Sequence, residues 1–303
     1  MISAIRPPTV LQRRLNAAID SLLNSRPNGS VDFSTPKGEA ALTSPDSVSW
    51  RIFKNPIALF VGGTAAVILE LADPAVRAGV WQHSSFRKNP IARLQRTGLA
   101  AMITVYGARA VAQAMIERVV RMHASVKGTT PDGMRYHAND PQLLTWVHAT
   151  AAYSFAVAYD RYVTRLHEAE FGRAFVEGAP VARLYGADAP PCSLADMRAL
   201  FEREMPRLDA SPVIFEFLGI MRTTPALPRS LQWMQRILVR AAVDLVPDRI
   251  RERLGLTRAH GLRRHERWLT QLAGATSDKI ILTGSPAVQS CMRLGLPISH
   301  LYS

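Results

Sequence analysis

Cysteine is scarce in this 303-residue chain and occurs only at Cys192 and Cys291. Two cysteines so far apart form neither a zinc motif nor a redox motif, and they cannot build the disulfide framework of a small secreted domain. We expect both to be ordinary buried or free thiols. The basic N-terminal residues are not followed by an apolar stretch, so no secretory signal is predicted. These absences favour a cytoplasmic protein.

Long uninterrupted hydrophobic runs are also lacking. Residues 56–69 carry no charge, but the run is shorter than the roughly 18 residues that a membrane span needs. Residues 141–159 are numerous enough, yet polar side chains recur along them, namely Gln142, Thr145, His148, Thr150 and Ser154. We therefore predict two buried core helices and no transmembrane segment.

Motifs of several common chemistries are absent. Gly62-Gly63 is not a dinucleotide fingerprint, because no strand precedes it and no third glycine follows at the required spacing. The sequence contains no phosphate-binding loop, Gly-x-Ser-x-Gly elbow, His-Glu-x-x-His zinc motif or Glu-x-x-His di-iron pair. The cysteine signature of the haem-thiolate mono-oxygenases is missing as well.

Alternating β patterns are nearly absent, with residues 279–282 as the one exception. Helical periodicity and helix-start signals instead predict an all-α fold of about eight to eleven helices. Gly62-Gly63 is expected to break the first core helix near its start, and Ala179–Ser193 is expected to be a loop. The main predicted helices cover residues 56–71, 99–126, 141–162, 194–204, 212–220, 227–245, 248–256 and 264–272. Asn89-Pro90 and Asp140-Pro141 are expected to start helices, Asp73-Pro74 to end one helix or cap the next, and residues 128–133 to form a turn.

Three regions are predicted along the chain. Residues 1–47 comprise a basic amphipathic helix up to about Arg26 and a linker rich in Ser, Thr, Pro and Gly. Residues 48–275 form the main helical domain. Residues 276–303 form a C-terminal tail that packs on this domain.

Acidic residues are too few to balance the basic ones, and the net charge is +13. Residues 222–267 hold eleven arginines, no lysine and four acids, so this segment alone carries +7. No zinc finger, aromatic RNA-binding motif or helix-turn-helix accompanies the charge, and nucleic-acid binding is therefore not expected. The segment is interpreted as a solvated basic face or as a docking surface for a partner such as an electron donor.

His123 lies near the end of the helical pattern of residues 99–126. Met115 and Val119 precede it at helical spacing on one apolar face, and Arg118 lies nearby. A histidine on such a face is most often a hydrogen-bonded core residue. An apolar wall, a neutral imidazole and arginines are also what a haem site requires, as wall, axial ligand and propionate partners. His123 is therefore the candidate iron ligand, with Met115, Val119 and Arg118 as candidate cofactor-binding residues.

His148 is the second candidate, because it too is predicted to face inward, on the helix that contains Trp146 and Phe155. Two such histidines fit a bis-histidine haem, and they fit equally well one ligand beside a structural histidine. His83 is a third candidate in a weaker helical context. The other histidines are expected at the surface or in loops, namely His137, His167, His260, His265 and His300.

Arg93 and Thr97 are four residues apart and so share a helix face. The ordinary interpretation is a surface turn. The functional interpretation is a pair on the open side of a haem, where arginine supplies a fixed charge and a threonine hydroxyl donates or relays a proton toward dioxygen. Glu70 is an acid within an apolar run, which is unfavourable unless it is paired or functional. It is a candidate base or ion-pair partner.

Four ordered segments carry a resemblance to a known family. They are Asp73–Val80 with His83-Ser84, Arg93–Thr97, His123–Gly128 and Asp140–Ala149. With these segments the chain resembles the mpaB-type oxygenases and the latex-clearing rubber oxygenases, which share one domain. The similarity covers roughly residues 52–267.

The resemblance implies an all-α fold with a globin-like core, b-type haem, and use of dioxygen to cleave or oxidise hydrophobic isoprenoid chains. It makes His123 the axial ligand and places Arg93 and Thr97 on the distal side. In the rubber-cleaving branch a lysine can stand over the iron; Arg96 occupies the matching position, and a guanidinium has no free lone pair to bind iron. The resemblance therefore implies an open or water-bound distal site. Where the family often has histidine this chain has Asp73, and a carboxylate role would fall to Glu70.

The sequence thus predicts a b-type haem-dependent oxygenase that acts with O2 or peroxide on a hydrophobic small molecule, isoprenoid-like or a secondary metabolite. The candidate catalytic residues are Arg93, Arg96, Thr97 and Glu70, and His148 is expected to line the haem pocket. Two alternatives stay open. One is a haem peroxidase or oxidase that inserts no oxygen, and the other is a non-catalytic haem sensor or carrier.

Overall fold

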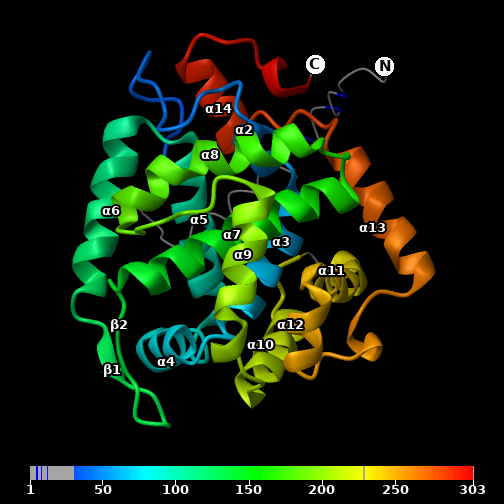
Figure 1. The fold of residues 1–303 in the computed structure, drawn as a ribbon. Helices are drawn as coiled ribbons and strands as arrows, with labels where there is room; N and C mark the ends of the chain where they lie inside the picture. Colours follow the sequence, from blue (N-terminus) through cyan, green and yellow to red (C-terminus); the bar gives the residue numbers. More distant parts are fainter. Residues whose placement is uncertain (1–4, 6–7, 9–11, 13–30, 228, 303) are drawn as a thin grey trace.

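Helices make up most of the described chain (Figure 1). The computed structural model describes residues 5, 8, 12, 31–227 and 229–302, and this part of the chain contains thirteen α-helices and one two-stranded sheet. The all-α prediction is confirmed, whereas a globin-like arrangement of the core stays a prediction. The predicted amphipathic helix of the N-terminus lies largely outside the described residues.

The elements follow one another as α2 (Val48–Phe53), α3 (Pro56–Glu70), α4 (Pro74–His83), α5 (Pro90–Tyr106), α6 (Arg109–His123), β1 (Lys127–Thr129), β2 (Arg135–His137), α7 (Pro141–Tyr162), α8 (Glu168–Tyr185), α9 (Leu194–Glu204), α10 (Pro212–Thr223), α11 (Gln232–Leu245), α12 (Asp248–Arg253), α13 (Arg264–Ser277) and α14 (Pro286–Arg293). Short 3-10 turns cover Met205–Arg207, Arg229–Leu231, Arg258–His260 and His300–Tyr302.

Four helices begin at an Asn-Pro or Asp-Pro pair. Asn55, Asp73, Asn89 and Asp140 precede α3, α4, α5 and α7, and the side-chain oxygen of each accepts backbone N–H groups of the first turn. These N–H groups have no partner within the helix, and the proline that follows lacks an N–H altogether. The starts predicted at Asp73, Asn89 and Asp140 are confirmed.

The centre of the molecule is the pair α3 and α7, which pack along each other (Figure 1). A Cβ atom on Gly62 of α3 would lie only 2.7 Å from Cδ1 of Phe155 and 2.9 Å from its Cα. A glycine is therefore what allows the two backbones to approach so closely. In Figure 1, α6 borders this centre on one side, and α11 and α13 border it on the other.

The predicted break at Gly62-Gly63 is wrong, since α3 runs without interruption from Pro56 to Glu70. The cost of glycine in a helix is offset here by the close packing against α7. The predicted single helix of residues 99–126 is also wrong. It is divided at Gly107 into α5 and α6, and a Cβ on Gly107 would lie 2.5 Å from the carbonyl oxygen of Ile103.

The predicted loop at Ala179–Ser193 begins too early. Helix α8 continues to Tyr185 and contains Pro180, which is exposed. Only residues 186–193 form the connection to α9. A second element was missed, since β1 and β2 pair antiparallel as a short hairpin after α6, where the sequence predicted only a turn.

The C-terminal tail packs on the helical domain through α14, which contacts α5. Next to the end of α13, Asp278 forms an ion pair of 3.1 Å with Lys54, the residue that follows α2. No single described helix is both long and apolar enough to cross a membrane, although α3 and α4 taken together, with a bend of 111° between them, meet that criterion.

Candidate active site

Three of the predicted site residues lie near the ends of three different helices, and Arg93 affects the other two electrostatically. Glu70 is the last residue of α3, Arg93 lies in the first turn of α5, and His123 is the last residue of α6. Burial is the largest cause of the pKa shifts of Glu70, whose pKa is raised, and of His123, whose pKa is lowered; the positive charge of Arg93 has a smaller, lowering effect on both. Because such effects fade with distance and solvent, the guanidinium lies within electrostatic range of both side chains. We call these three residues the Arg93 cluster.

Burial dominates the acid–base chemistry of Glu70. The loss of solvation raises the pKa of this carboxyl to about 7, against the smaller opposing effect of Arg93. Burial likewise lowers the pKa of Arg93, the Glu70 charge raises it, and the like charge of Arg96 lowers it. Within the described part of the chain, neither the carboxyl of Glu70 nor the guanidinium of Arg93 forms an ion pair or a hydrogen bond. Both keep their hydrogen-bonding capacity for a ligand.

His123 is partly buried and is held in its neutral form. Its pKa is lowered by burial, by the charge of Arg93 and by His137. Its Nδ1 atom is buried and has no hydrogen-bond partner among the described residues. A neutral imidazole has a lone pair available for a metal, so His123 has the protonation state that an iron ligand needs.

Met115 and Val119 lie two turns and one turn, respectively, before His123 on the same helix. Met115 is buried, and the hydroxyl of Tyr185 from α8 contacts its sulfur at 3.8 Å. Val119 is partly buried and packs against the same cluster of apolar residues. This side of α6 is therefore apolar up to His123. Arg118 lies on the exposed side of the helix.

Arg96 and Thr97 are exposed, although they share α5 with Arg93. The guanidinium of Arg96 donates a hydrogen bond of 2.6 Å to Oγ of Ser85. The hydroxyl of Thr97 donates to the carbonyl oxygen of Arg93 at 2.9 Å. Thr97 is thus connected to the Arg93 cluster by the hydrogen bond from its hydroxyl to the backbone carbonyl of Arg93.

His148 lies apart from the Arg93 cluster. A Cβ atom on Gly178 would be 3.3 Å from Cε1 of His148, so the ring is pressed against the backbone of α8. Burial alone lowers the pKa of His148 to about 4, with no contribution from Arg93 or His123. Its Nε2 is buried without a partner in the part of the chain that the structure describes. The ring thus packs between α7 and α8, and a role for His148 at the cofactor stays a prediction.

The side chain of His83 contacts the hairpin formed by β1 and β2. Its Nε2 lies 3.2 Å from the hydroxyl of Tyr136 on β2, and this hydroxyl also donates to Gln82 at 3.2 Å. Gly128 on β1 lets the tyrosine pack, because a Cβ there would lie 2.7 Å from the same hydroxyl oxygen. His83 therefore has a packing role in this structure.

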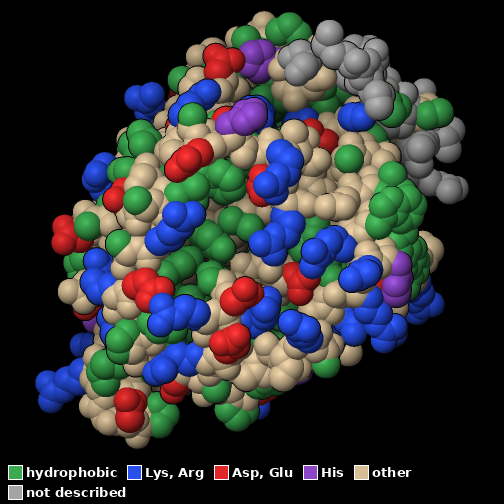
Figure 2. Space-filling model, turned by 45° about the vertical axis from the view of Figure 1, so that its right-hand side comes forward, with side chains coloured by type: hydrophobic (Ala, Val, Ile, Leu, Met, Phe, Trp, Pro, Cys, Tyr) green, Lys and Arg blue, Asp and Glu red, His purple; other side chains and the backbone are tan. Residues whose placement is uncertain are grey.

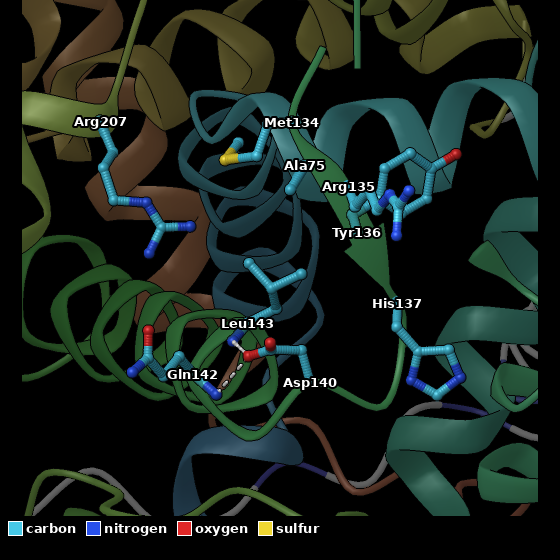
Figure 3. A pocket seen from close by; sticks show the side chains of 9 residues that line it. All are labelled: Ala75, Met134, Arg135, Tyr136, His137, Asp140, Gln142, Leu143 and Arg207. Carbon is cyan, nitrogen blue, oxygen red and sulfur yellow. Dashed lines mark hydrogen bonds between the residues drawn. The ribbon is translucent and has the colours of Figure 1, made fainter. Parts of the chain in front are cut away.

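The hairpin forms one wall of an open pocket of about 400 Å³ that the sequence did not predict (Figure 3). Arg207 faces this pocket from one side and Arg135 from the other, over the apolar side chains of Ala75 and Leu143. None of the predicted site residues lines it. His137 does, and it links the pocket to the cluster, since its Nε2 lies 3.3 Å from the carbonyl oxygen of Ala124 and it affects the pKa of His123.

The donor set of the Arg93 cluster limits which metal centre it suits. Among the described residues, no group of three or more His, Cys, Asp or Glu side chains is arranged to hold a metal ion. A haem iron takes most of its ligands from the porphyrin and needs only one or two from the protein. A single neutral histidine beside an apolar wall suits that requirement.

Comparison with known proteins identifies the domain. Residues 50–277 match the model of the family described as the ER-bound oxygenase mpaB/B'/rubber oxygenase catalytic domain. The chain belongs to this family. The mpaB/rubber oxygenase domain extends from α2 to the end of α13 and contains the whole Arg93 cluster, so the protein carries an oxygenase catalytic domain. No curated protein and no solved structure matches the chain.

Proposed function

We propose that the protein is a b-type haem-dependent oxygenase that uses O2 to oxidise a hydrophobic, isoprenoid-like small molecule. The observation that supports this most is His123, a neutral imidazole with an unpartnered buried nitrogen at the end of an apolar helix face. It lies beside Arg93 and Glu70 within a domain of the mpaB/rubber oxygenase family. In this proposal His123 holds the iron, and the haem supplies the chemistry that activates dioxygen.

Arg93 supplies a fixed positive charge that does not act as a base. A partly buried guanidinium without an ion pair can bind a carboxylate of the cofactor or stabilise negative charge that develops on oxygen. Its effect on His123 also keeps the imidazole neutral. Arg93 is therefore the residue we assign to charge stabilisation.

Glu70 is suited to moving a proton. With a pKa of about 7, its carboxyl is protonated in a large fraction of molecules near neutral pH and can both donate and accept a proton. We assign Glu70 as the acid–base group. The proton of the Thr97 hydroxyl is engaged with the carbonyl oxygen of Arg93, so Thr97 can donate to a ligand only when that hydrogen bond breaks.

An absorption spectrum tests the cofactor. The protein purified after expression with added haem is expected to show a Soret band, and the His123→Ala variant is expected to lose or shift it. His148→Ala is the matched control, since His148 is also buried and unpartnered but lies outside the cluster; its band should stay. Absence of the band from the unaltered protein would refute haem binding, and an unchanged band in His123→Ala would move the ligand elsewhere.

Turnover with isotopically labelled dioxygen tests the reaction class. An oxygenase transfers label from O2 into the oxidised terpenoid product. A peroxidase or oxidase yields an unlabelled product, and a sensor or carrier yields no product at all. Label in the product is the expected outcome.

A further inference from the structure

The outer face of α13 presents large apolar side chains to solvent. Trp268 is 61% exposed and Leu272 is 50% exposed. They are four residues apart and therefore lie on one side of the helix, together with His265 and Arg264 in its first turn. With Arg263, which precedes the helix, these residues are called the α13 face.

The orientation of this helix is fixed by its inner side. Glu266, Thr270 and Gly274 are buried, and a Cβ atom on Gly274 would lie 2.1 Å from the carbonyl oxygen of Tyr162 in α7. No larger residue fits there without moving the helix. The exposure of Trp268 and Leu272 is thus a consequence of how α13 packs.

The α13 face is basic and has no acid of its own. Glu266 is the one acid in residues 258–277, and it is buried and paired with Arg240 at 2.8 Å. In the described structure no ion pair joins Arg258, Arg263 or Arg264 to an acidic side chain. Figure 2 shows the corresponding side of the molecule, where basic and hydrophobic side chains lie together and acidic ones are sparse on the right.

We propose that the α13 face binds the surface of an anionic membrane, with the helix lying in the plane of the interface. An indole, an aliphatic side chain and unpaired guanidinium groups on one helix match the bilayer interface, where phosphates lie above the acyl chains. The arginines pair with lipid phosphates. Trp268 and Leu272 enter the boundary of the acyl region, which removes their apolar surface from water.

An acidic protein or a nucleic acid would also form ion pairs with the arginines. A membrane matches the exposed apolar side chains as well. The α13 face belongs to the segment of residues 222–267, whose net charge is +7. Helix α11 of this segment packs against α13, and its exposed Arg236 has no ion pair in the described structure. A broad positive surface around exposed apolar side chains suits a planar array of anions with an apolar layer beneath. Nucleic acid offers no such layer. The inference concerns attachment and is independent of the proposed oxygenase activity.

Flotation with lipid vesicles tests the proposal on the full-length protein. It is expected to float with vesicles of phosphatidylcholine and phosphatidylglycerol, to stay unbound with phosphatidylcholine alone, and to lose binding as salt is raised. Arg263→Gln with Arg264→Gln should weaken binding about five-fold for each arginine. Trp268→Ser with Leu272→Ser should weaken it about ten-fold or more.

Two control variants address the location. Val176→Ser with Leu184→Ser removes two apolar side chains of α8 that are 54% and 45% exposed; α8 packs against α2, α6, α7 and α9. Arg183→Gln with Arg198→Gln removes two exposed positive charges from α8 and α9. Both controls should bind nearly as well as the unaltered protein. Circular dichroism and the melting temperature establish that every variant is folded.

Three results would overturn the proposal. One is the absence of binding to the anionic vesicles. The second is an equal loss of binding in the Val176/Leu184 control and the Trp268/Leu272 variant, which would remove the assignment to α13. The third is binding to heparin, a soluble polyanion, with no binding to vesicles, which would indicate a polyanion or an acidic protein as the partner.

Discussion

Glu70 and Arg93 carry opposite charges in the same partly buried region, yet they form no ion pair. A direct contact would lower the pKa of the carboxyl, whereas burial without contact raises it to about 7. The arrangement resembles a site in which a bound group completes the hydrogen bonds of both side chains. At this scale the stability and the chemistry of the site depend on the same two residues.

The Glu70→Gln variant tests the burial of this carboxyl. Because the pKa of Glu70 is higher in the folded protein than in the unfolded chain, the folded state binds more protons between pH 4.5 and about 7. The free energy of unfolding of the unaltered protein should fall over this interval by at most about 3 kcal/mol. The Glu70→Gln variant lacks this titrating carboxyl, so its free energy of unfolding should fall less over the same interval. Denaturant unfolding from pH 4 to pH 8 measures the difference, and parallel pH profiles would contradict it.

The Arg93→Gln variant tests the electrostatic link within the cluster. Loss of this positive charge should raise the pKa of His123 and also that of Glu70, because Arg93 lowers both. Titration of the histidine ring protons by NMR in the haem-free protein measures the first shift. His148 serves as an internal reference, since burial alone sets its pKa. Arg96→Gln is the control, and equal shifts of His123 in the two variants would be evidence against the cluster.

At the scale of elements, short-range signals were more informative than long-range ones. The sequence predicted the helix starts at Asp73, Asn89 and Asp140, because capping involves only neighbouring residues. It failed where a distant segment decides the outcome. The glycine pair in α3 looked like a break, and only the approach of Phe155 explains it. Pro180 looked like part of a loop, and only the structure shows that α8 continues through it.

Gly62→Ala tests the contact between α3 and α7. The added Cβ would lie 2.7 Å from Phe155 Cδ1, so the two helices must separate, and the free energy of unfolding should fall by about 1–3 kcal/mol. Gly172→Ala is the matched control, since a Cβ on Gly172 of α8 would have no atom within 4 Å apart from its chain neighbours and the backbone of the helix itself. There the substitution should stabilise by about 0.5–1 kcal/mol. Denaturant unfolding is expected to show opposite signs for the two changes in the free energy of unfolding. If Gly172→Ala also destabilises the protein, the effect of Gly62→Ala cannot be assigned to the contact between α3 and α7.

At the scale of the whole molecule, the all-α class was predictable because helical periodicity is visible in each segment separately. The placement of Glu70, Arg93 and His123 in one region was not, since it depends on how the ends of three separate helices pack in space. Periodicity did place His123 on one face with Met115 and Val119. The family resemblance had to supply the importance of Arg93, because its spacing from Thr97 is equally typical of a surface turn.

Arg293 shows how the ends of the described chain are joined to the domain. Its side chain is 1% exposed, and its guanidinium donates to the carbonyl oxygens of Phe33, Glu39 and Tyr106 at 2.7–2.8 Å. One residue of α14 thereby links the segment before α2 to the end of α5. Buried backbone carbonyls must have donors. Ser290 also donates to the carbonyl of Tyr106, whereas Arg293 supplies the donors of the Phe33 and Glu39 carbonyls.

Arg293→Met should therefore destabilise the protein by about 3 kcal/mol or more, because three carbonyl groups lose a charged donor together. Arg293→Lys keeps the charge but cannot reach all three acceptors, so its effect should be intermediate. Arg183→Met, at an exposed position of α8, is the control and should change stability little. Thermal unfolding measures these differences, and limited proteolysis should show faster cleavage in residues 31–47 for Arg293→Met alone. If cleavage there is unchanged while stability falls, Arg293 stabilises the tail without joining it to the segment before α2.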